Sequence, residues 1–339
     1  MRRSALDLAE VADWRNLAAA FHAASQGKSA RQDVVAFGRS LDAELASLRR
    51  EILAGELRLG GMKSFWIRDP KLRLIHAPCF RDRVLHHALI NFVGPELERA
   101  LVFDSYACRI GKGTLAAVRR CQQHIRRFPV FAKIDIRRYF PSVDHGVLLD
   151  LLARRFKNKT LPDVLAQIIG GHSSSPGKGL PIGALTSQHF ANYYLSGLDR
   201  FILETQKAQG FVRYMDDLIW WQGDKQQICE TLEAVGQFAR ERLSLEVKSP
   251  SQTGCSRDGV MFCGFRISSG GLRLSRRRRI RYAERRHFWE EAFLRDEIGV
   301  RELQMGYDCA LAITSHADSV GWRRAQLRRR PLAEALRDL

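Results

Sequence analysis

Apolar residues recur every three to four positions in the part of the chain that precedes the glycine pair Gly60-Gly61. This spacing is typical of helices that bury one face. Residues 1–60 are therefore predicted to form a helical N-terminal extension. The clearest repeats fall at Val35, Phe37, Leu41, Leu45 and Leu48.

Between residues 61 and 270, short apolar runs alternate irregularly with helical stretches. The runs at 65–67 and 72–77 predict two strands, joined by the turn-forming residues 68–71. This irregular alternation favours an α+β fold over a doubly wound α/β fold. Further strands are predicted at 129–136 and 261–267, a polar loop at 173–183, and helices at 82–98, 145–156 and 184–203.

The segment RYMDDLIWW, residues 213–221, places two adjacent acidic residues inside an apolar run. This profile predicts a β-hairpin whose tight turn lies at Asp216 and Asp217. At a separation of about 4 Å and a surface-like dielectric, two carboxylates repel each other by about 4 kcal/mol. An exposed, solvated turn and a site for a divalent cation would both relieve this repulsion.

A third carboxylate, Asp135, ends the predicted strand 129–136 and lies 81 residues before Asp216. Alternation along that strand places Phe131, Lys133 and Asp135 on one side of a sheet. Carboxylates from separate strands can hold two Mg²⁺ ions about 3.5–4 Å apart, one activating the attacking oxygen and the other stabilising the leaving one. The three aspartates are therefore a candidate two-metal site.

The charge balance suggests the kind of partner. The net charge is +18, which indicates a polyanionic partner with nucleic acid as the first candidate, although a basic enzyme can have the same composition. Residues 273–339 hold sixteen arginines and ten acidic residues on a helical background and predict a separate basic helical domain. Its arginines suit a nucleic-acid backbone, but a solvated helix face with i,i+4 ion pairs would look similar.

Cysteine usage and the N-terminus bear on location. The seven cysteines include no CxxC pair, which argues against a disulfide framework and a zinc ribbon. The N-terminal sequence becomes polar too early for a signal peptide. No uninterrupted apolar run approaches the ~20 residues needed to cross a bilayer. We therefore expect a cytoplasmic protein with no membrane partner.

Six motifs follow one another along the central part of the chain. They are RLIHAPCFRDRVLHHAL, DSYACRIGKGT, FAKIDIRRYFPSVDH, GLPIGALTSQHFAN, RYMDD and VMFCGFRI. In order and spacing they resemble the motifs of reverse transcriptases. The resemblance covers residues 65–268 and is closest to the enzymes of diversity-generating retroelements, although defence-associated and unclassified bacterial reverse transcriptases share much of it.

The resemblance implies a right-hand polymerase fold of fingers, palm and thumb, with an antiparallel palm sheet and a helical C-terminal thumb. The implied divisions are the N-terminal extension at 1–60, the fingers at 61–128 with a further part at 145–182, the palm at 129–270 and the basic thumb at 271–339.

The same resemblance assigns catalytic roles. Asp135, Asp216 and Asp217 match the metal-binding triad of the family, and the backbone carbonyl of Ile136 is an additional implied ligand. Lys248 matches a lysine beside the triphosphate and could donate a proton to the leaving pyrophosphate.

Four residues are implied to contact the incoming nucleotide. Arg73 matches a residue that grips the triphosphate, for which a forked guanidinium is well suited, and Lys71 is a second candidate. A solvated strand arginine would have the same sequence appearance as Arg73. Phe140 matches the steric gate that excludes a ribose 2′-OH, although core packing also explains it. Ile182 lies where the family places residues against the sugar and template base.

Ile182 also marks a departure from the family. Many reverse transcriptases carry Pro-Gln-Gly where this chain has Pro181-Ile182-Gly183. Replacing the glutamine by isoleucine removes hydrogen-bonding atoms, which weakens discrimination between right and wrong pairs. We therefore expect low fidelity, as the resemblance to the retroelement enzymes also implies. The residues implied to contact primer and template are Ser187, Gln188, Phe262, Gly264, Arg276, Arg277, Arg278 and Arg279.

The expected activity is RNA-directed DNA polymerisation by two-metal phosphoryl transfer, with two Mg²⁺ ions as cofactors and Mn²⁺ as a substitute. The expected partners are an RNA template, a DNA or RNA primer and dNTPs, and the retroelement type adds a small basic accessory protein and a structured cognate RNA. One alternative is an anti-phage defence-associated or unclassified bacterial reverse transcriptase. Another is a catalytically inert RNA-binding scaffold.

Overall fold

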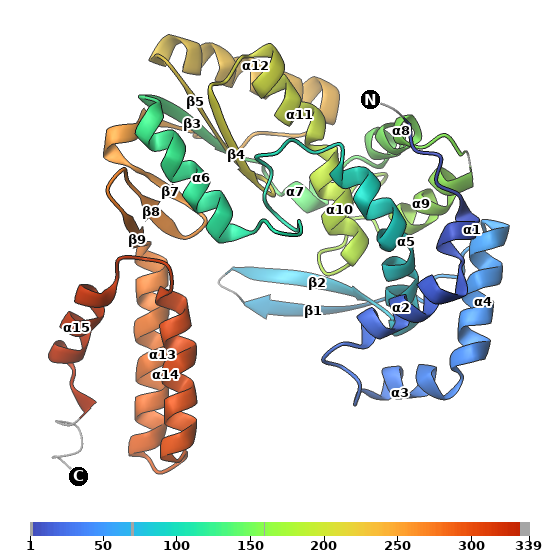
Figure 1. The fold of residues 1–339 in the computed structure, drawn as a ribbon, viewed down its shortest axis with the longest axis horizontal. Coiled ribbons are helices and arrows are strands. Elements are labelled where there is room, and N and C mark those ends of the chain that lie inside the picture. Colours follow the sequence, from blue (N-terminus) through green and yellow to red (C-terminus); the bar gives the residue numbers. More distant parts are fainter. Residues whose placement is uncertain (1–2, 69–70, 159, 333–339) are drawn as a thin grey trace.

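The computed structural model describes residues 3–68, 71–158 and 160–332, and Figure 1 shows three antiparallel sheets surrounded by helices. The predicted α+β fold is therefore confirmed. A four-stranded sheet has the order β4-β5-β3-β6, and smaller sheets have the orders β1-β2 and β7-β8-β9. The strands are β1 (Met62–Arg68), β2 (Leu72–Pro78), β3 (Val130–Asp135), β4 (Gly210–Tyr214), β5 (Asp217–Gln222), β6 (Gln252–Cys255), β7 (Val260–Phe262), β8 (Phe265–Ile267) and β9 (Leu272–Leu274).

The N-terminal extension is helical, as predicted, and packs against α5 (Phe80–Glu98), which the sequence also predicted. The side chain of Asp13 accepts hydrogen bonds from the first turn of its helix, and Gly55 ends the last helix with a φ of 72°. Such caps satisfy backbone groups that a helix end leaves unpaired. The helices of the extension are α1 (Leu8–Val11), α2 (Trp14–Ser25), α3 (Gln32–Arg39) and α4 (Leu41–Ala54).

The two strands predicted at 65–67 and 72–77 form the hairpin β1–β2, in which Phe65 pairs with Ile75. Two residues of the predicted turn, Asp69 and Pro70, lie outside the described residues. In Figure 1 this hairpin extends away from α2 and α5.

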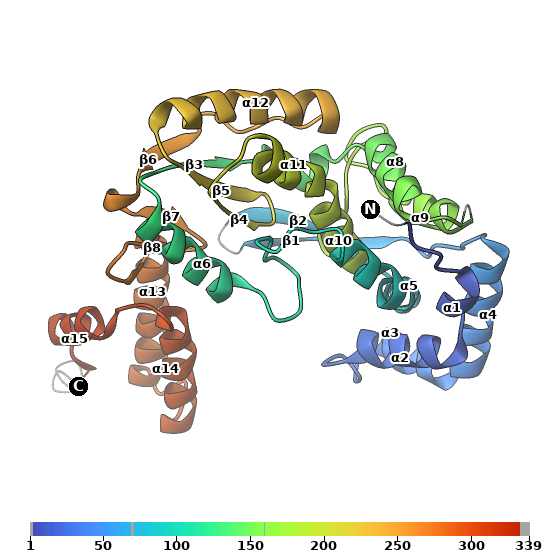
Figure 2. The same cartoon turned by 45° about the horizontal axis from the view of Figure 1, so that its top comes forward.

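The four-stranded sheet is buried on both faces, and this explains the apolar run after the two aspartates. Leu218 and Trp220 of β5 join the large core beneath α12 (Lys225–Leu243), whereas Ile219 and Trp221 join a second core beneath α6 (Thr114–Arg127). Figure 2 shows these two helices on opposite sides of the sheet. A strand buried on both faces is apolar at successive positions, without alternation.

The helix predicted at 184–203 is interrupted. It consists of α10 (Leu185–Tyr194), α11 (Ser196–Arg200) and a π-helical turn, η1 (Phe201–Thr205). The break lies at Leu195, which is itself buried. The apolar spacing of residues 184–203 therefore continues through the break, so this spacing alone could not reveal where the helix is interrupted. The helices between β3 and α10 are α7 (Tyr139–Ser142), α8 (His145–Arg155) and α9 (Thr160–Gly170).

The strand predicted at 261–267 is instead the hairpin β7–β8. Its turn residues Cys263 and Gly264 have φ angles of 47° and 80°, which a continuous strand does not allow. After β9 the chain forms α13 (Arg276–Leu294), α14 (Val300–Thr314) and α15 (Val320–Arg329), as expected for a helical C-terminal region. Figure 1 shows α13 and α14 packed side by side away from the central sheet.

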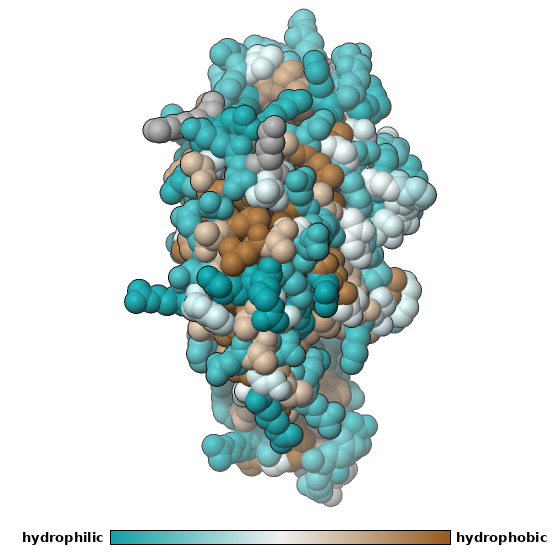
Figure 3. Space-filling model, turned by 90° about the vertical axis from the view of Figure 1, so that its right-hand side faces the viewer, coloured by the Kyte–Doolittle hydropathy of each residue, from teal (hydrophilic) through white to brown (hydrophobic). Residues whose placement is uncertain are grey.

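Figure 3 shows the right-hand face of the molecule, where hydrophilic residues surround a group of hydrophobic ones near the centre. None of the helices in the described part of the chain combines the length and apolar character needed to span a bilayer.

Candidate active site

The antiparallel pairing of β3 with β5 places Asp135 directly opposite Asp217. The hairpin β4–β5 pairs Tyr214 with Asp217, so its turn consists of Met215 and Asp216. The predicted hairpin is confirmed, but the turn lies one residue earlier than expected. Met215 has a φ of 57°, a conformation that non-glycine residues adopt mainly in tight turns. All three predicted aspartates thus meet at one end of the sheet.

The two aspartates of the turn are electrostatically strained. Burial, followed by the nearby charge of Asp135, raises the pKa of Asp216 to about 6, while the positive charge of Arg73 opposes this shift. Burial also raises the pKa of Asp217 to about 7, although Lys133 lowers it. Desolvation and like charges both disfavour a carboxylate, and the nearby cations Arg73 and Lys133 offset this only in part.

These carboxylates fit a divalent cation. The Oδ1 atom of Asp217 is buried, and the Nζ atom of Lys133 lies 3.2 Å from it as an ion-pair partner. Hard cations such as Mg²⁺ prefer carboxylate oxygens and typically use one or two of them together with substrate phosphates. Among the described residues, no group of three or more His, Cys, Asp or Glu side chains is arranged so that it could hold a metal ion. An ion bound by one or two of these carboxylates would take its other ligands from substrate phosphates.

Lys248 and Ile136 lie beside the triad. The Nζ atom of Lys248 is 3.6 Å from Oδ2 of Asp135, and its backbone N–H donates to the Asp135 carbonyl at 2.8 Å. The backbone N–H of Ile136 donates to the Asp216 carbonyl at 3.4 Å. These contacts place both residues next to the carboxylates.

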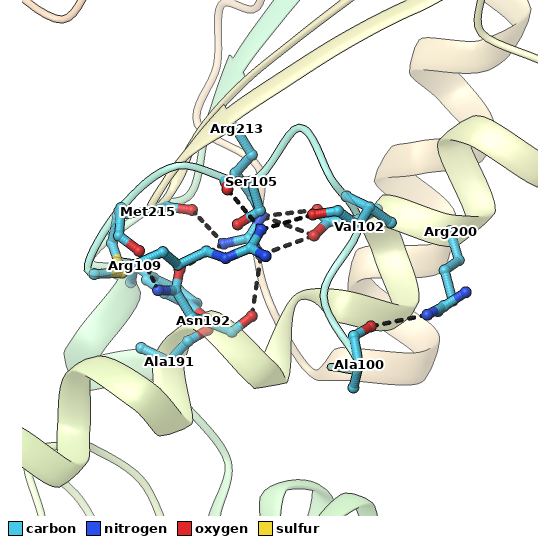
Figure 4. Close-up of polar contacts among 12 residues, drawn as sticks. Ala100, Val102, Ser105, Arg109, Ala191, Asn192, Arg200, Arg213 and Met215 are labelled. Carbon is cyan, nitrogen blue, oxygen red and sulfur yellow. Dashed lines mark hydrogen bonds and ion pairs between the residues drawn. The ribbon is translucent and has the colours of Figure 1, made fainter. Parts of the chain in front are cut away.

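A buried arginine, Arg213, donates a hydrogen bond to the backbone of the hairpin turn, as Figure 4 shows. Arg213 donates to both carboxylate oxygens of Asp199, at 2.7 Å to each, and both side chains are 0% exposed. Its Nη1 atom donates at 3.0 Å to Oδ1 of Asn192 and at 3.0 Å to the Met215 carbonyl. Because Met215 precedes Asp216, this bond fixes the backbone that presents the carboxylates.

The loop 101–113 is hydrogen-bonded to β4 and α10 beside the hairpin turn. Ser105 pairs with Arg213 of β4, and Arg109 donates at 2.8 Å to the carbonyls of Val102 and Ser105 (Figure 4). The side chain of Asn192 donates to the Ala107 carbonyl at 2.6 Å. The motif DSYACRIGKGT thus forms an additional edge beside the RYMDD strand.

The predicted nucleotide-contacting residues come from three segments. Arg73 and Lys71 are exposed near the start of β2, and the charge of Arg73 acts on Asp216. The Ile182 carbonyl accepts a hydrogen bond from the backbone N–H of His76 at 2.8 Å, which joins its loop to β2. Phe140 packs partly against the large core, and its carbonyl accepts from the backbone N–H of Leu180 at 2.8 Å.

Gly183 allows this close approach between the loop and the hairpin. It has a φ of 123°, and a side-chain Cβ at this position would lie 2.8 Å from Ile75 and 3.1 Å from the carbonyl oxygen of His76. No other residue fits such a contact without displacement.

The predicted primer and template residues are distributed over α10, the β7–β8 hairpin and α13. On α10, Ser187 is buried and Gln188 is exposed. Phe262 is buried beneath the hairpin, and Gly264 forms its turn. Of the four consecutive arginines, Arg278 lies 4.2 Å from the centre of the Phe265 ring. The other three, Arg276, Arg277 and Arg279, are exposed.

Sequence reasoning assigned no role to Lys133 or to the partners of Arg213. Lys133 lies 3.2 Å from Oδ1 of Asp217. The predicted alternation placed it on the same side as Asp135, which was a usable signal. Asp199 and Asn192 gave no comparable signal, because a polar residue in an amphipathic helix is usually exposed.

Comparison with known proteins gives one family match. The family described as "Reverse transcriptase (RNA-dependent DNA polymerase)" matches residues 67–267. The "Putative COX1/OXI3 intron 2 protein" of Saccharomyces cerevisiae is 20% identical over 129 residues, which cover 36% of this chain and 15% of that protein. "Protein YkfC" of Escherichia coli is 26% identical over 179 residues, which cover 48% of this chain and 46% of that protein. This chain therefore matches less than half the length of either relative.

Among solved structures, apo telomerase from Candida tropicalis aligns with a TM-score of 0.49 and 11% identity, over 80% of this chain and 61% of that chain. Telomerase from Candida albicans, in complex with a fragment of telomeric RNA, aligns with a TM-score of 0.47 and 10% identity, over 70% of this chain and 51% of that chain.

Proposed function

The chain belongs to the reverse transcriptase (RNA-dependent DNA polymerase) family, and on this premise we propose that it extends a primer 3′ end with dNTPs on an RNA template. The observation that carries the proposal is the convergence of three carboxylates: β3 brings Asp135 opposite Asp217, next to Asp216 in the turn. Burial raises the pKa of Asp216 and Asp217, and a bound cation would offset this cost of ionising them.

Asp135, Asp216 and Asp217, with the Ile136 carbonyl, would hold two Mg²⁺ ions, and Mn²⁺ could replace them. When bound, these ions would supply positive charge to the attacking and leaving oxygens. Lys248 lies on the Asp135 side of the carboxylates, where its ammonium could donate a proton to the leaving pyrophosphate.

Three other side chains near the carboxylates would contact the incoming nucleotide. Arg73 is exposed and within electrostatic range of Asp216, so its guanidinium could bind triphosphate oxygens in pairs. Phe140 would exclude a ribose 2′-OH. Ile182 would contact the sugar and the base pair through its shape alone.

The same proposal divides the chain into functional regions. The fingers would be residues 61–128 with 145–182, the palm 129–270 and the thumb 271–339, of which residues 333–339 lie outside the described part. The division is supported by the projecting β1–β2 hairpin, the central four-stranded sheet and the separate helices α13 to α15 (Figure 1).

Primer extension on a heteropolymeric RNA tests this function directly. Purified protein, annealed DNA primer, dNTPs and Mg²⁺ should yield a product that is sensitive to DNase and complementary to the template when sequenced. The variant Asp216→Asn/Asp217→Asn should bind the same primer–template without extending it. Extension that does not depend on these aspartates would overturn the assignment of the site, and binding without any extension by the wild type would favour an inert RNA-binding scaffold.

We further propose that the chain is a low-fidelity enzyme of the diversity-generating retroelement type, acting in the cytoplasm with a small basic accessory protein and a structured cognate RNA. Ile182 supports this proposal, because its side chain offers no hydrogen bond to the sugar or base. An anti-phage defence enzyme or another bacterial reverse transcriptase is the alternative. Sequencing products made with and without RNA from the protein's own locus would distinguish the two contexts.

Fidelity has its own test. Ile182→Gln introduces a hydrogen-bonding amide and should lower misincorporation on a defined RNA by about tenfold, the size expected for roughly 1.4 kcal/mol of added discrimination. Ile182→Leu keeps an apolar side chain and is the matched control. Error rates are counted by sequencing single-pass products. Equal error rates for the glutamine variant and the wild type would contradict the role of Ile182.

A further inference from the structure

Lys133 makes a contact between two sheets that the proposed mechanism does not use. It lies on β3, two residues before Asp135 and on the same face of the strand. Its Nζ atom is 3.2 Å from Oδ1 of Asp217 on β5 and donates at 2.9 Å to the Met261 carbonyl on β7. The ammonium also lies 5.7 Å from the centre of the Phe262 ring.

This contact joins two separate sheets. The strands β3 and β5 belong to the four-stranded sheet, whereas β7 belongs to the three-stranded sheet. On this face, Phe131 of the larger sheet and Phe262 of the smaller one both belong to the apolar second core. Apolar packing allows small sliding movements, but a hydrogen bond to a fixed carbonyl has a defined direction.

The position of Lys133 differs from that of a surface lysine. Its side chain is 19% exposed, and that of Asp217 is 28% exposed. An ion pair between solvated groups contributes little because water screens it, but here the ammonium is partly enclosed between a carboxylate, a carbonyl and an aromatic ring. A side chain with three donors can satisfy more than one of these acceptors at once.

We propose that Lys133 is a positioning residue that fixes the β7–β8 hairpin relative to Asp217. This inference rests on the proposed function, in which the hairpin carries Phe262 and Gly264 to the primer end. Lys133 acts through the Met261 carbonyl and does not touch the nucleic acid. Its ammonium sets the separation between the bound primer end and the carboxylates.

The simplest alternative is that Lys133 only balances the charge of Asp217. A double-mutant cycle separates the two roles. In an Asp217→Asn background the carboxylate is absent. A lysine that only balances this charge then has no effect on binding, whereas a lysine that holds the Met261 carbonyl keeps its effect.

The experiment measures binding of a fluorescent primer–template with a recessed 3′ end, by anisotropy in EDTA, so that no catalysis is required. Lys133→Met removes the ammonium and keeps a long side chain. It should raise the Kd about three- to tenfold, in both the wild-type and the Asp217→Asn backgrounds. Lys133→Arg should recover most of the affinity because it restores a donor. Lys225→Met, at an exposed position of α12, is the control for loss of one positive charge.

The salt dependence of the same binding curves provides a second readout. A lysine that contacts phosphate changes the slope of log K against log[salt] by about one when it is removed. Lys133→Met should leave this slope unchanged. Circular dichroism and thermal unfolding of each variant establish that it is folded before its Kd is compared.

Three results would overturn the proposal: an unchanged Kd for Lys133→Met, an effect that disappears in the Asp217→Asn background, or a slope that changes by about one. A different result would show that the proposed function is wrong and the role of Lys133 is right. In that case the wild type binds the primer–template without extending it, and Lys133→Met still weakens binding.

Discussion

Asp216 and Asp217 are held where burial makes them harder to ionise than in the unfolded chain. Burial raises the pKa of both, to about 6 and about 7. A carboxyl group whose pKa is higher in the folded than in the unfolded state binds protons more readily when folded. The free energy of unfolding therefore decreases as the pH rises from about 4 towards 7, and the loss is complete above the folded pKa values.

This effect predicts that removing the two charges stabilises the protein. In EDTA at pH 8, Asp216→Asn/Asp217→Asn should have a free energy of unfolding higher than the wild type by on the order of 2 kcal/mol. The difference should shrink towards zero as the pH is lowered to 4, because both carboxyl groups are then neutral in the wild type. Urea unfolding across this pH range measures it, with Asp150→Asn, an exposed position on α8, as control. A difference that stays constant with pH would contradict the proposed electrostatic strain.

At the scale of elements, the hairpin β4–β5 depends on a buried ion pair between β4 and α11. Arg213 and Asp199 are fully buried and hydrogen-bonded to each other. The same guanidinium donates to the Met215 carbonyl in the turn. Stability and the geometry of the turn are thus linked in one side chain.

Arg213→Met should destabilise the protein by about 3–5 kcal/mol, because it leaves the Asp199 carboxylate buried without a partner. The paired change Arg213→Met/Asp199→Leu should recover much of this stability, since apolar replacements of a buried pair are often tolerated. It should not recover polymerase activity, because the Met215 carbonyl still lacks its donor. Urea unfolding and primer extension measure the two properties. A fully active paired variant would show that the turn does not need Arg213.

The elements that hold the carboxylates were predicted from the sequence, whereas the helices that cover the central sheet were not. The β3 strand and the RYMDD hairpin were predicted because their apolar runs end at acidic residues. The helices α6 and α12 were not predicted, although each buries one face against the central sheet. Their buried apolar residues nevertheless recur at helical spacing, as at Ala117, Cys121 and Ile125 of α6, so the sequence held a signal for both helices.

The buried polar residues were harder still to predict. Asp199 and Arg213 lie 14 residues apart on different elements, and each alone looks like a surface charge. Their pairing depends on the break after α10, which positions α11 beside β4. The turn of the hairpin also shifted by one residue, because register is fixed by pairing across strands rather than by local composition.

At the scale of the whole molecule, the charge of +18 is partly concentrated on α13, beside the β7–β8 hairpin. Arg276, Arg277 and Arg279 are exposed on its first turn. Next to them, Arg278 is held against Phe265 of the hairpin. This arrangement suits a helix that contacts the backbone of a primer–template duplex close to the primer end.

We predict that binding of the primer–template depends steeply on salt and that these arginines contribute to the slope. Changing all three exposed arginines to glutamine should reduce the magnitude of the slope of log K against log[salt] by about 2–3, since each phosphate contact contributes about 0.9. Fluorescence anisotropy at several salt concentrations measures it. The matched control changes Arg15, Arg39 and Arg50, which are exposed on the N-terminal helices. Equal slopes for both triple variants would show that α13 has no special role.

The central claim is that Asp135, Asp216 and Asp217 form one site that copies RNA into DNA. The most direct measurement is the single-turnover rate of adding one complementary dNTP to a primer annealed to RNA, at saturating Mg²⁺. The account predicts that Asp135→Asn, Asp216→Asn and Asp217→Asn each lower this rate by at least about a thousandfold, or about 4 kcal/mol, while primer–template affinity in EDTA changes little. Addition at the wild-type rate by any of these folded variants would contradict it.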